Sequence, residues 1–233
     1  MADISPPPTA QPASASTRQR RKEARPEQLL DAALSLFVEK GFAATRSEEV
    51  AARAGVAKGT LYLYYPSKEE LLKAVVRENL SKCIGEAASI AEGYEGSSSE
   101  LLALLLHTWW ERVGEKPASG IFKIVLTEMG NFPDFAGFYL QEVIQPGREL
   151  FSRVLQRGID AGEFRQIDLV QAVHVFIFPM LMLCMQKHSL GACPGMEEMT
   201  DAREFISTHI DVVLHGLQVR EPQPATTAKS KRS

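Results

Sequence analysis

The stretch that decides the fold is TRSEEVAARAGVAKGTLYLYYPSKEELL, which runs from Thr45 to Leu72. Within it, Ala51 is a small residue at the point where two helices would cross closely. Gly55, four positions later, permits a tight turn between them. The apolar positions that would hold both helices against a preceding one are Val50, Val56 and Leu61. This spacing predicts a helix-turn-helix, whose second helix can enter a DNA major groove.

Helical patterns continue on both sides of this stretch. An apolar stripe from Leu29 to Phe37 predicts a preceding helix, and Gly41 follows it where a left-handed residue is common. Ser67 and Glu70 have the spacing of a capping box that begins a long helix ending near Ala91. Further helices are predicted over 100–114, 118–130, 134–160, 168–188 and 200–218. No stretch shows sustained strand alternation, so the predicted fold class is all-α, with about nine helices.

Composition and charge limit the classes of function that the protein can have. The chain has 233 residues, 45% of them hydrophobic and 24% charged, which is typical of a globular protein. Its net charge is −3, but residues 1–75 carry 11 Lys and Arg against 9 Asp and Glu, a net charge of +2. Five of these cations are close together, at Arg18, Arg20, Arg21, Lys22 and Arg25. A part that binds a polyanion is therefore expected at the N-terminal end.

The two ends of the chain and its cysteines indicate disordered terminal segments and the cellular compartment of the protein. Residues 1–24 and 221–233 are polar and biased in composition, which predicts a disordered basic arm and a disordered tail. Three cysteines favour a reducing compartment. The longest apolar stretch, 172–185, is shorter than the ~20 residues of a membrane-spanning helix, and the N-terminus lacks a signal-peptide pattern. The sequence thus predicts a cytoplasmic protein with no membrane partner.

Thr45–Leu72, together with AALSLFVEKGF at 32–42, resembles the N-terminal signature of the TetR family of bacterial transcriptional regulators. The segments AGVAKGTLY at 54–62 and YPSKEEL at 65–71 carry most of this resemblance. The later segment Phe122–Gly162, with EMGNFPD at 128–134, is similar to AefR-like effector domains. The resemblance implies a DNA-binding domain at 25–70 and a helical effector-binding and dimerisation domain at 71–220.

The same resemblance, carried over position by position, implies a set of DNA contacts. Tyr62 and Lys68 would contact phosphates, while Leu63 and Tyr64 would face base edges. Arg46 departs from the family, which has a small capping hydroxyl there, so we expect Thr45 and Glu48 to form the capping box and Arg46 to reach a phosphate. The implied DNA-binding residues are Arg46, Ser47, Lys58, Gly59, Thr60, Tyr62, Leu63, Tyr64 and Lys68. Two interpretations of the basic arm stay open, a solubilising tail or a minor-groove contact.

The C-terminal part shows no catalytic or metal-binding motif. The five histidines include no His-Glu-x-x-His, and neither Cys-x-x-Cys nor Gly-x-Ser-x-Gly occurs. We therefore expect no enzyme activity, no cofactor and no metal. Bulky apolar residues instead favour an apolar effector pocket, with His107 and His174 as polar anchors. The candidate effector-binding residues are His107, Trp110, Met129, Phe132, Phe135, Tyr139, His174 and Phe178.

The predicted function is that of a ligand-responsive regulator, in which a small apolar or aromatic effector releases a repressor from double-stranded operator DNA. The helices at 168–188 and 200–218 are too apolar to be exposed all round, so they are expected to form a homodimer interface. A scaffold with a vestigial helix-turn-helix and an enzyme are the rival classes. Within the favoured class, an activator or a nucleoid-associated protein stays open.

Overall fold

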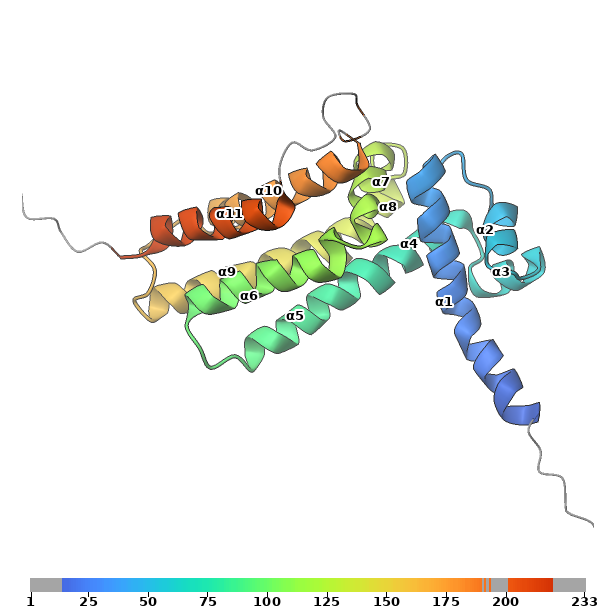
Figure 1. Ribbon diagram of the computed structural model, residues 1–233, viewed down its shortest axis with the longest axis horizontal. Helices are drawn as coiled ribbons and strands as arrows, with labels where there is room; N and C mark the ends of the chain where they lie inside the picture. The colour runs from blue at the N-terminus through green and yellow to red at the C-terminus, as the bar shows by residue number, and fades with distance from the viewer. Residues whose placement is uncertain (1–13, 190, 192, 194–200, 220–233) are drawn as a thin grey trace, which may run out of the picture. The chain divides into compact units, whose positions relative to one another are not determined.

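The computed structural model describes residues 14–189, 191, 193 and 201–219, with side chains from Pro26 onward, and over these residues the fold is all-α (Figure 1). The chain divides into two compact units, with the boundary between Val75 and Val76 rather than between residues 70 and 71. The described residues form nine continuous helical runs, as predicted. One isolated antiparallel bridge, between Phe164 and Gln218, is the β pairing found in the described part of the chain.

The N-terminal part of the chain contains four helices: α1 (Ser14–Lys40), α2 (Ser47–Arg53), α3 (Lys58–Tyr64) and α4 (Lys68–Val76). The start of α1 corrects the sequence prediction, because residues 14–24 are helical here and not a flexible arm. Arginine, glutamine, lysine and alanine are good helix formers, and no glycine or proline occurs between Ser14 and Arg25. The predicted tail at 221–233 and residues 1–13 lie outside the described residues.

The core of the Met1–Val75 unit explains why α2 and α3 hold their positions. Apolar side chains from all four helices are fully buried there: Leu29, Ala33, Phe37, Val50, Leu61 and Leu71. The predicted glycine turns are confirmed, since Gly41 and Gly55 have φ angles of 84° and 67°. These left-handed conformations suit glycine, and they direct the chain from α1 toward α2 and from α2 toward α3.

The Val76–Ser233 unit is a helical bundle with several π-helical turns. The run from α4 continues through η1 (Arg77–Ser81) into α5 (Lys82–Glu92). The remaining helices are α6 (Ser98–Trp109) with η2 (Trp110–Gly114), η3 (Pro117–Gly120) with α7 (Ile121–Glu128), α8 (Pro133–Tyr139) with η4 (Leu140–Ile144) and α9 (Gln145–Asp160), α10 (Leu169–His188) and α11 (Ala202–Leu217). Helix α9 packs against α5, α6 and α10, and α11 packs against α6 and α10 (Figure 1).

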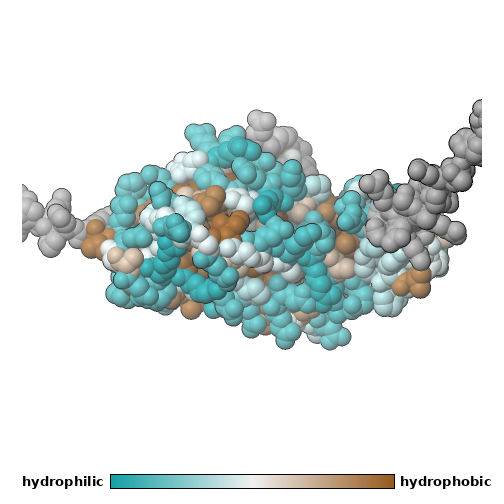
Figure 2. All heavy atoms as spheres, turned by 90° about the horizontal axis from the view of Figure 1, so that it is seen from below, coloured by the Kyte–Doolittle hydropathy of each residue, from teal (hydrophilic) through white to brown (hydrophobic). Residues whose placement is uncertain are grey.

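Helix α10 runs from Leu169 to His188 with Pro179 inside it, and a proline has no backbone N–H to donate to the preceding turn. Among the described residues, α10 is the helix that is long and apolar enough to cross a membrane by length and composition alone. Only 28% of its most apolar window is buried within the chain. Val175, Phe178 and Met182 lie one or two turns apart and are exposed. Apolar residues also reach the surface among hydrophilic ones on the face shown in Figure 2.

Candidate functional site

Helix α3 presents the residues that the sequence assigned to DNA. Leu61 is fully buried and anchors the helix, whereas Leu63 is 81% exposed and Tyr62 is 40% exposed. Thr60 and Tyr64 are half-buried, and Gly59 is exposed. Apart from its chain neighbours and the backbone of its own helix, no atom lies within 4 Å of the place that a Cβ on Gly59 would take. Packing within the unit therefore does not require this glycine, whereas close approach by another molecule would.

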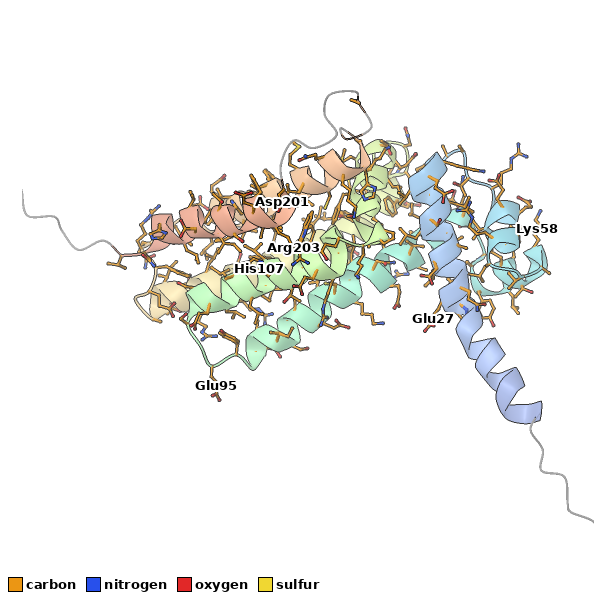
Figure 3. The ribbon with its side chains drawn as sticks, viewed as in Figure 1. Glu27, Lys58, Glu95, His107, Asp201 and Arg203 are labelled. Atoms are coloured by element: carbon orange, nitrogen blue, oxygen red, sulfur yellow. The ribbon has the colours of Figure 1, made fainter. Side chains whose placement is uncertain are left out.

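Lys58 begins α3 at the surface of the unit (Figure 3). Its ammonium pairs with the Glu48 carboxylate of α2 and lies 5.8 Å from the centre of the Tyr62 ring. The hydrogen bond from Lys58 holds the pKa of Glu48 below its usual value, and the same bond raises the pKa of Lys58. Because the pair is exposed, it contributes little to the stability of the unit.

The start of α2 differs from the sequence prediction. The helix begins at Ser47 with Arg46 as its N-cap, and the Glu49 carboxylate accepts from the Arg46 backbone N–H at 3.1 Å. The predicted capping box of Thr45 and Glu48 is therefore wrong. Thr45 is buried, and its hydroxyl is 2.8 Å from the Gly41 carbonyl oxygen to which it donates. Ser47 is also buried.

Arg46 and Lys68 have opposite surroundings. Arg46 is exposed, and its guanidinium makes no ion pair or hydrogen bond within the described residues. The Lys68 ammonium instead donates to three backbone carbonyl oxygens, those of Phe42, Ala43 and Thr45, at 2.8, 3.2 and 3.1 Å. An ammonium has three donors, so these bonds occupy all of them. The geometry thus makes Arg46 available for a phosphate and gives Lys68 a structural role.

A cavity of about 380 Å³ lies inside the Val76–Ser233 unit, and its wall is mainly apolar. Of the predicted effector-binding residues, Met129, Tyr139 and His174 line this cavity. The other predicted residues lie elsewhere: His107 and Phe178 are exposed, Trp110 and Phe135 are buried in the core, and Phe132 is half-buried outside the lining.

The two adjacent tryptophans explain one of these differences. Trp109 lines the cavity and packs against Phe122, with ring centres 5.7 Å apart. Trp110 turns away, and its ring lies where any Cβ on Gly114 would be. The sequence shows that the two rings diverge by about 100°, but not which of them faces inward.

Arg148 is the functional candidate that the sequence reasoning missed. It lines the cavity from α9, and its guanidinium makes no ion pair or hydrogen bond among the described residues. Ile144, Gly147, Arg148 and Phe151 all line the cavity, at the spacing of one helix face. A cation on an otherwise apolar helix face is the signal that could have found it.

Tyr139 supplies a second polar group to the cavity. Its side chain is buried, and its hydroxyl makes no hydrogen bond within the described part of the chain. Burial raises the pKa of Tyr139 well above its usual value of 10, so the hydroxyl stays a neutral donor. Burial likewise raises the pKa of the Cys83 thiol, which also lines the cavity. Arg112, at the same wall, is paired with Glu86.

Two further observations concern metal binding and a serine–histidine pair among the described residues. No group of three or more His, Cys, Asp or Glu residues among them could hold a metal ion. Ser119 Oγ lies 2.7 Å from His188 Nε2, but Ser119 is completely buried and its hydroxyl also bonds to the Lys116 carbonyl at 2.7 Å. This pair therefore joins η3 to the end of α10 and is closed to a substrate.

Comparisons with known proteins match both units. The family described as bacterial regulatory proteins, tetR family, matches residues 29–75, and the AefR-like transcriptional repressor, C-terminal domain, matches residues 100–214. The HTH-type transcriptional repressor KstR2 of Rhodococcus jostii is 28% identical over 196 residues, which are 84% of this chain and 92% of that protein.

Two solved structures show the same fold. The transcriptional regulator FadR from Bacillus subtilis, in complex with stearoyl-CoA, has a TM-score of 0.66 at 18% identity, covering 82% of this chain and 99% of that chain. A regulator from Saccharomonospora viridis, in complex with choline, has a TM-score of 0.69 at 19% identity, covering 85% of this chain and all of that chain.

Proposed function

Because the chain belongs to the TetR family of bacterial transcriptional regulators, with an AefR-like C-terminal domain, we propose that it is a repressor released from its operator by an amphipathic anion. It is a DNA-binding regulator and not an enzyme. The observation that carries the proposal is the apolar cavity lined by Arg148 and Tyr139, whose guanidinium and hydroxyl make no ion pair or hydrogen bond among the described residues.

The cavity indicates the chemistry of the effector. A volume of about 380 Å³ lies in the range of small-molecule sites, and its apolar wall suits a hydrocarbon chain or ring system. A partly buried cation without a counter-ion is unfavourable, and a carboxylate or phosphate of the ligand would relieve that cost. Tyr139 would donate a hydrogen bond to the same polar end. The FadR relative with stearoyl-CoA supports this class of ligand, whereas a cation such as choline suits Arg148 poorly.

The DNA-binding half of the proposal depends on α3 and on a second copy of the chain. Exposed Tyr62 and Leu63 would reach the major groove, and Arg46, Lys58 and Thr60 would contact the backbone. Two recognition helices about 34–36 Å apart would address successive turns of an operator. The exposed apolar side chains of α10 and α11 would be covered in a homodimer in the cytoplasm.

The mechanism that we propose is a shift between two populations. The effector binds more tightly to the dimer whose recognition helices are wrongly spaced. Operator affinity then falls by the ratio of the effector affinities for the two states.

Fluorescence anisotropy tests this proposal with operator DNA from upstream of the gene, scrambled DNA, and three ligands. Stearoyl-CoA and stearate are expected to weaken operator binding, with choline as the control that leaves it unchanged. Release by stearoyl-CoA but not by stearate would identify the coenzyme A phosphates as the recognised anion. Release by both stearoyl-CoA and stearate would show that an anionic group as small as a carboxylate is sufficient. Preference for choline would refute the anionic effector, and equal binding to both DNAs after ligand stripping would refute the repressor.

A further inference from the structure

The unit that carries the recognition helix has no excess positive charge once the start of α1 is left out. Residues 26–75 contain six Lys and Arg but seven Asp and Glu, a net charge of −1. Residues 1–25 contain five basic and two acidic residues, a net charge of +3. Neutralising phosphates is the main source of affinity for DNA, so residues 26–75 alone are poorly charged for that task.

The cations within residues 26–75 are also largely occupied. Four of the six form ion pairs on the surface: Lys40 with Glu49, Arg53 with Glu39, Lys58 with Glu48, and Lys73 with Glu70. Lys68 donates to three carbonyl oxygens. If Lys58 left Glu48 for a phosphate, the carboxylate would remain close to the polyanion. Arg46 is then the one cation of these residues whose guanidinium makes no ion pair or hydrogen bond with them.

The first part of α1 is helical and contains the basic residues that the rest of the unit lacks. Helix α1 begins at Ser14, and Figure 1 shows this part extending beyond α2 and α3. Arg18, Arg21, Lys22 and Arg25 occupy positions i, i+3, i+4 and i+7 of the helix. These positions share one face, about 100° wide. Glu23, the single acidic residue of Ser14–Arg25, falls on the opposite face.

We infer that Ser14–Arg25 is a second DNA-contacting element, in which these four cations, here called the basic stripe, neutralise phosphates of the operator. The inference rests on the proposed function, because the ligand of the stripe is the same DNA that α3 reads. Phosphate contacts carry no base information, so the stripe would raise affinity for all DNA sequences alike, while α3 would supply the preference for the operator.

The salt dependence of DNA binding tests this inference. In the stripe variant, Arg18, Arg21, Lys22 and Arg25 are all changed to glutamine. The slope of log K against log salt is expected to become shallower by up to about 3.6 per bound chain, since each neutralised phosphate contributes about 0.9. Affinity for operator and for scrambled DNA should fall in parallel. A slope equal to that of the wild-type protein would overturn the inference.

A matched control separates this effect from a change in total charge. In the tail variant, Arg220, Lys229, Lys231 and Arg232 are changed to glutamine, which removes the same four charges from the other end of the chain. The tail variant should keep the wild-type slope, and equal slopes in the two variants would overturn the inference. If the wild-type protein itself shows no preference for its upstream DNA, the proposed function fails instead, independently of the stripe.

A third variant tests the helical arrangement. Exchanging neighbours, with Arg18→Gln, Gln19→Arg, Ala24→Arg and Arg25→Ala, keeps composition and charge but moves two cations about 100° off the face. Weaker binding with unchanged thermal unfolding supports a helix that presents one face to DNA. Wild-type affinity in this variant would overturn that arrangement.

Discussion

The ammonium of Lys68 lies 2.8 Å from the carbonyl oxygen of Phe42 and 4.4 Å from the centre of the Phe42 ring. Its remaining donors reach the carbonyls of Ala43 and Thr45. One side chain at the start of α4 thus donates to three carbonyl oxygens of the segment between α1 and α2. The same lysine matches a DNA-contacting position of the family motif, so its two possible roles call for separate measurements.

Replacing Lys68 with methionine, which keeps most of the aliphatic stem, is expected to lower the free energy of unfolding by about 1–3 kcal/mol, because hydrogen bonds from a charged donor are lost. The slope of DNA affinity against salt should change little. Urea unfolding and anisotropy measure the two quantities. Lys40→Met is the control, since its exposed pair with Glu49 contributes at most about 1 kcal/mol. Unchanged stability with a slope shallower by about 0.9 would instead make Lys68 a phosphate contact.

Leu63 and Leu61 lie two positions apart on α3 and should respond in opposite ways to alanine. Leu63 is 81% exposed, so Leu63→Ala should leave stability within about 0.5 kcal/mol while weakening operator binding about fivefold or more. Leu61 is completely buried, so Leu61→Ala should cost roughly 2–5 kcal/mol in unfolding free energy. Full operator affinity in Leu63→Ala would remove this residue from the base-reading surface.

The sequence predicted the fold well because the helix boundaries depend on local signals. Gly41 and Gly55 take left-handed conformations, and Asp168 accepts from the Val170 and Gln171 amides at the start of α10. Such turns and caps involve neighbours in the chain. The boundary at Ser14 was missed because a polar, charged segment has the composition of a disordered arm as well as of an exposed helix.

The cavity was predicted less well, because its wall is decided by helix rotation and by contacts distant in sequence. Trp109 rather than Trp110 faces inward because Trp110 packs over Gly114. The structural role of Lys68 was missed for a similar reason, because its carbonyl partners lie 23 to 26 residues earlier in the sequence. Periodicity identified an apolar helical body, but not which of its side chains surround an empty volume.

Two substitutions in the cavity test its polar end. Arg148→Gln should weaken binding of an anionic effector about 10- to 100-fold, the equivalent of a charge-assisted hydrogen bond. Tyr139→Phe should weaken it about fivefold, because one neutral hydrogen bond is lost. The measurement is the effector concentration that half-releases operator DNA. Arg153→Gln is the matched control, because Arg153 is exposed on the same helix and pairs with Glu92 at 3.5 Å. Equal sensitivity of Arg153→Gln and Arg148→Gln would contradict a specific anchor at Arg148.

Stability should depend on pH through His188 and His209. Burial lowers the pKa of both side chains, and His209 Nε2 is buried without a hydrogen-bond partner among the described residues. Below about pH 6.5 the unfolded chain therefore binds more protons than the folded one, so stability should fall as pH falls from 7.5 to 5.5. Thermal unfolding over this range measures the effect.

His209→Phe should flatten this pH dependence, because it removes one titrating group but keeps a ring between Phe176 and Phe205. His107→Gln, at an exposed position of α6, should leave the dependence as in the wild-type protein. An undiminished dependence in His209→Phe would show that other groups cause it. The paired carboxylates Glu49 and Glu142 have lowered pKa values, so their contribution is lost only below about pH 4.5, outside this range.

The exposed face of α10 gives the last prediction. Phe178 and Met182 are each 60% exposed and lie one turn apart, so in a dimer they would lie near the centre of an apolar contact. Phe178→Glu should place an unpaired charge there and convert the dimer to monomer in light scattering at micromolar concentration. Operator affinity should fall with it, since two recognition helices would no longer be linked. Leu140→Glu, at a 43% exposed site on η4, should stay dimeric. A wild-type protein that is monomeric and binds lipid vesicles would instead assign this face to a membrane.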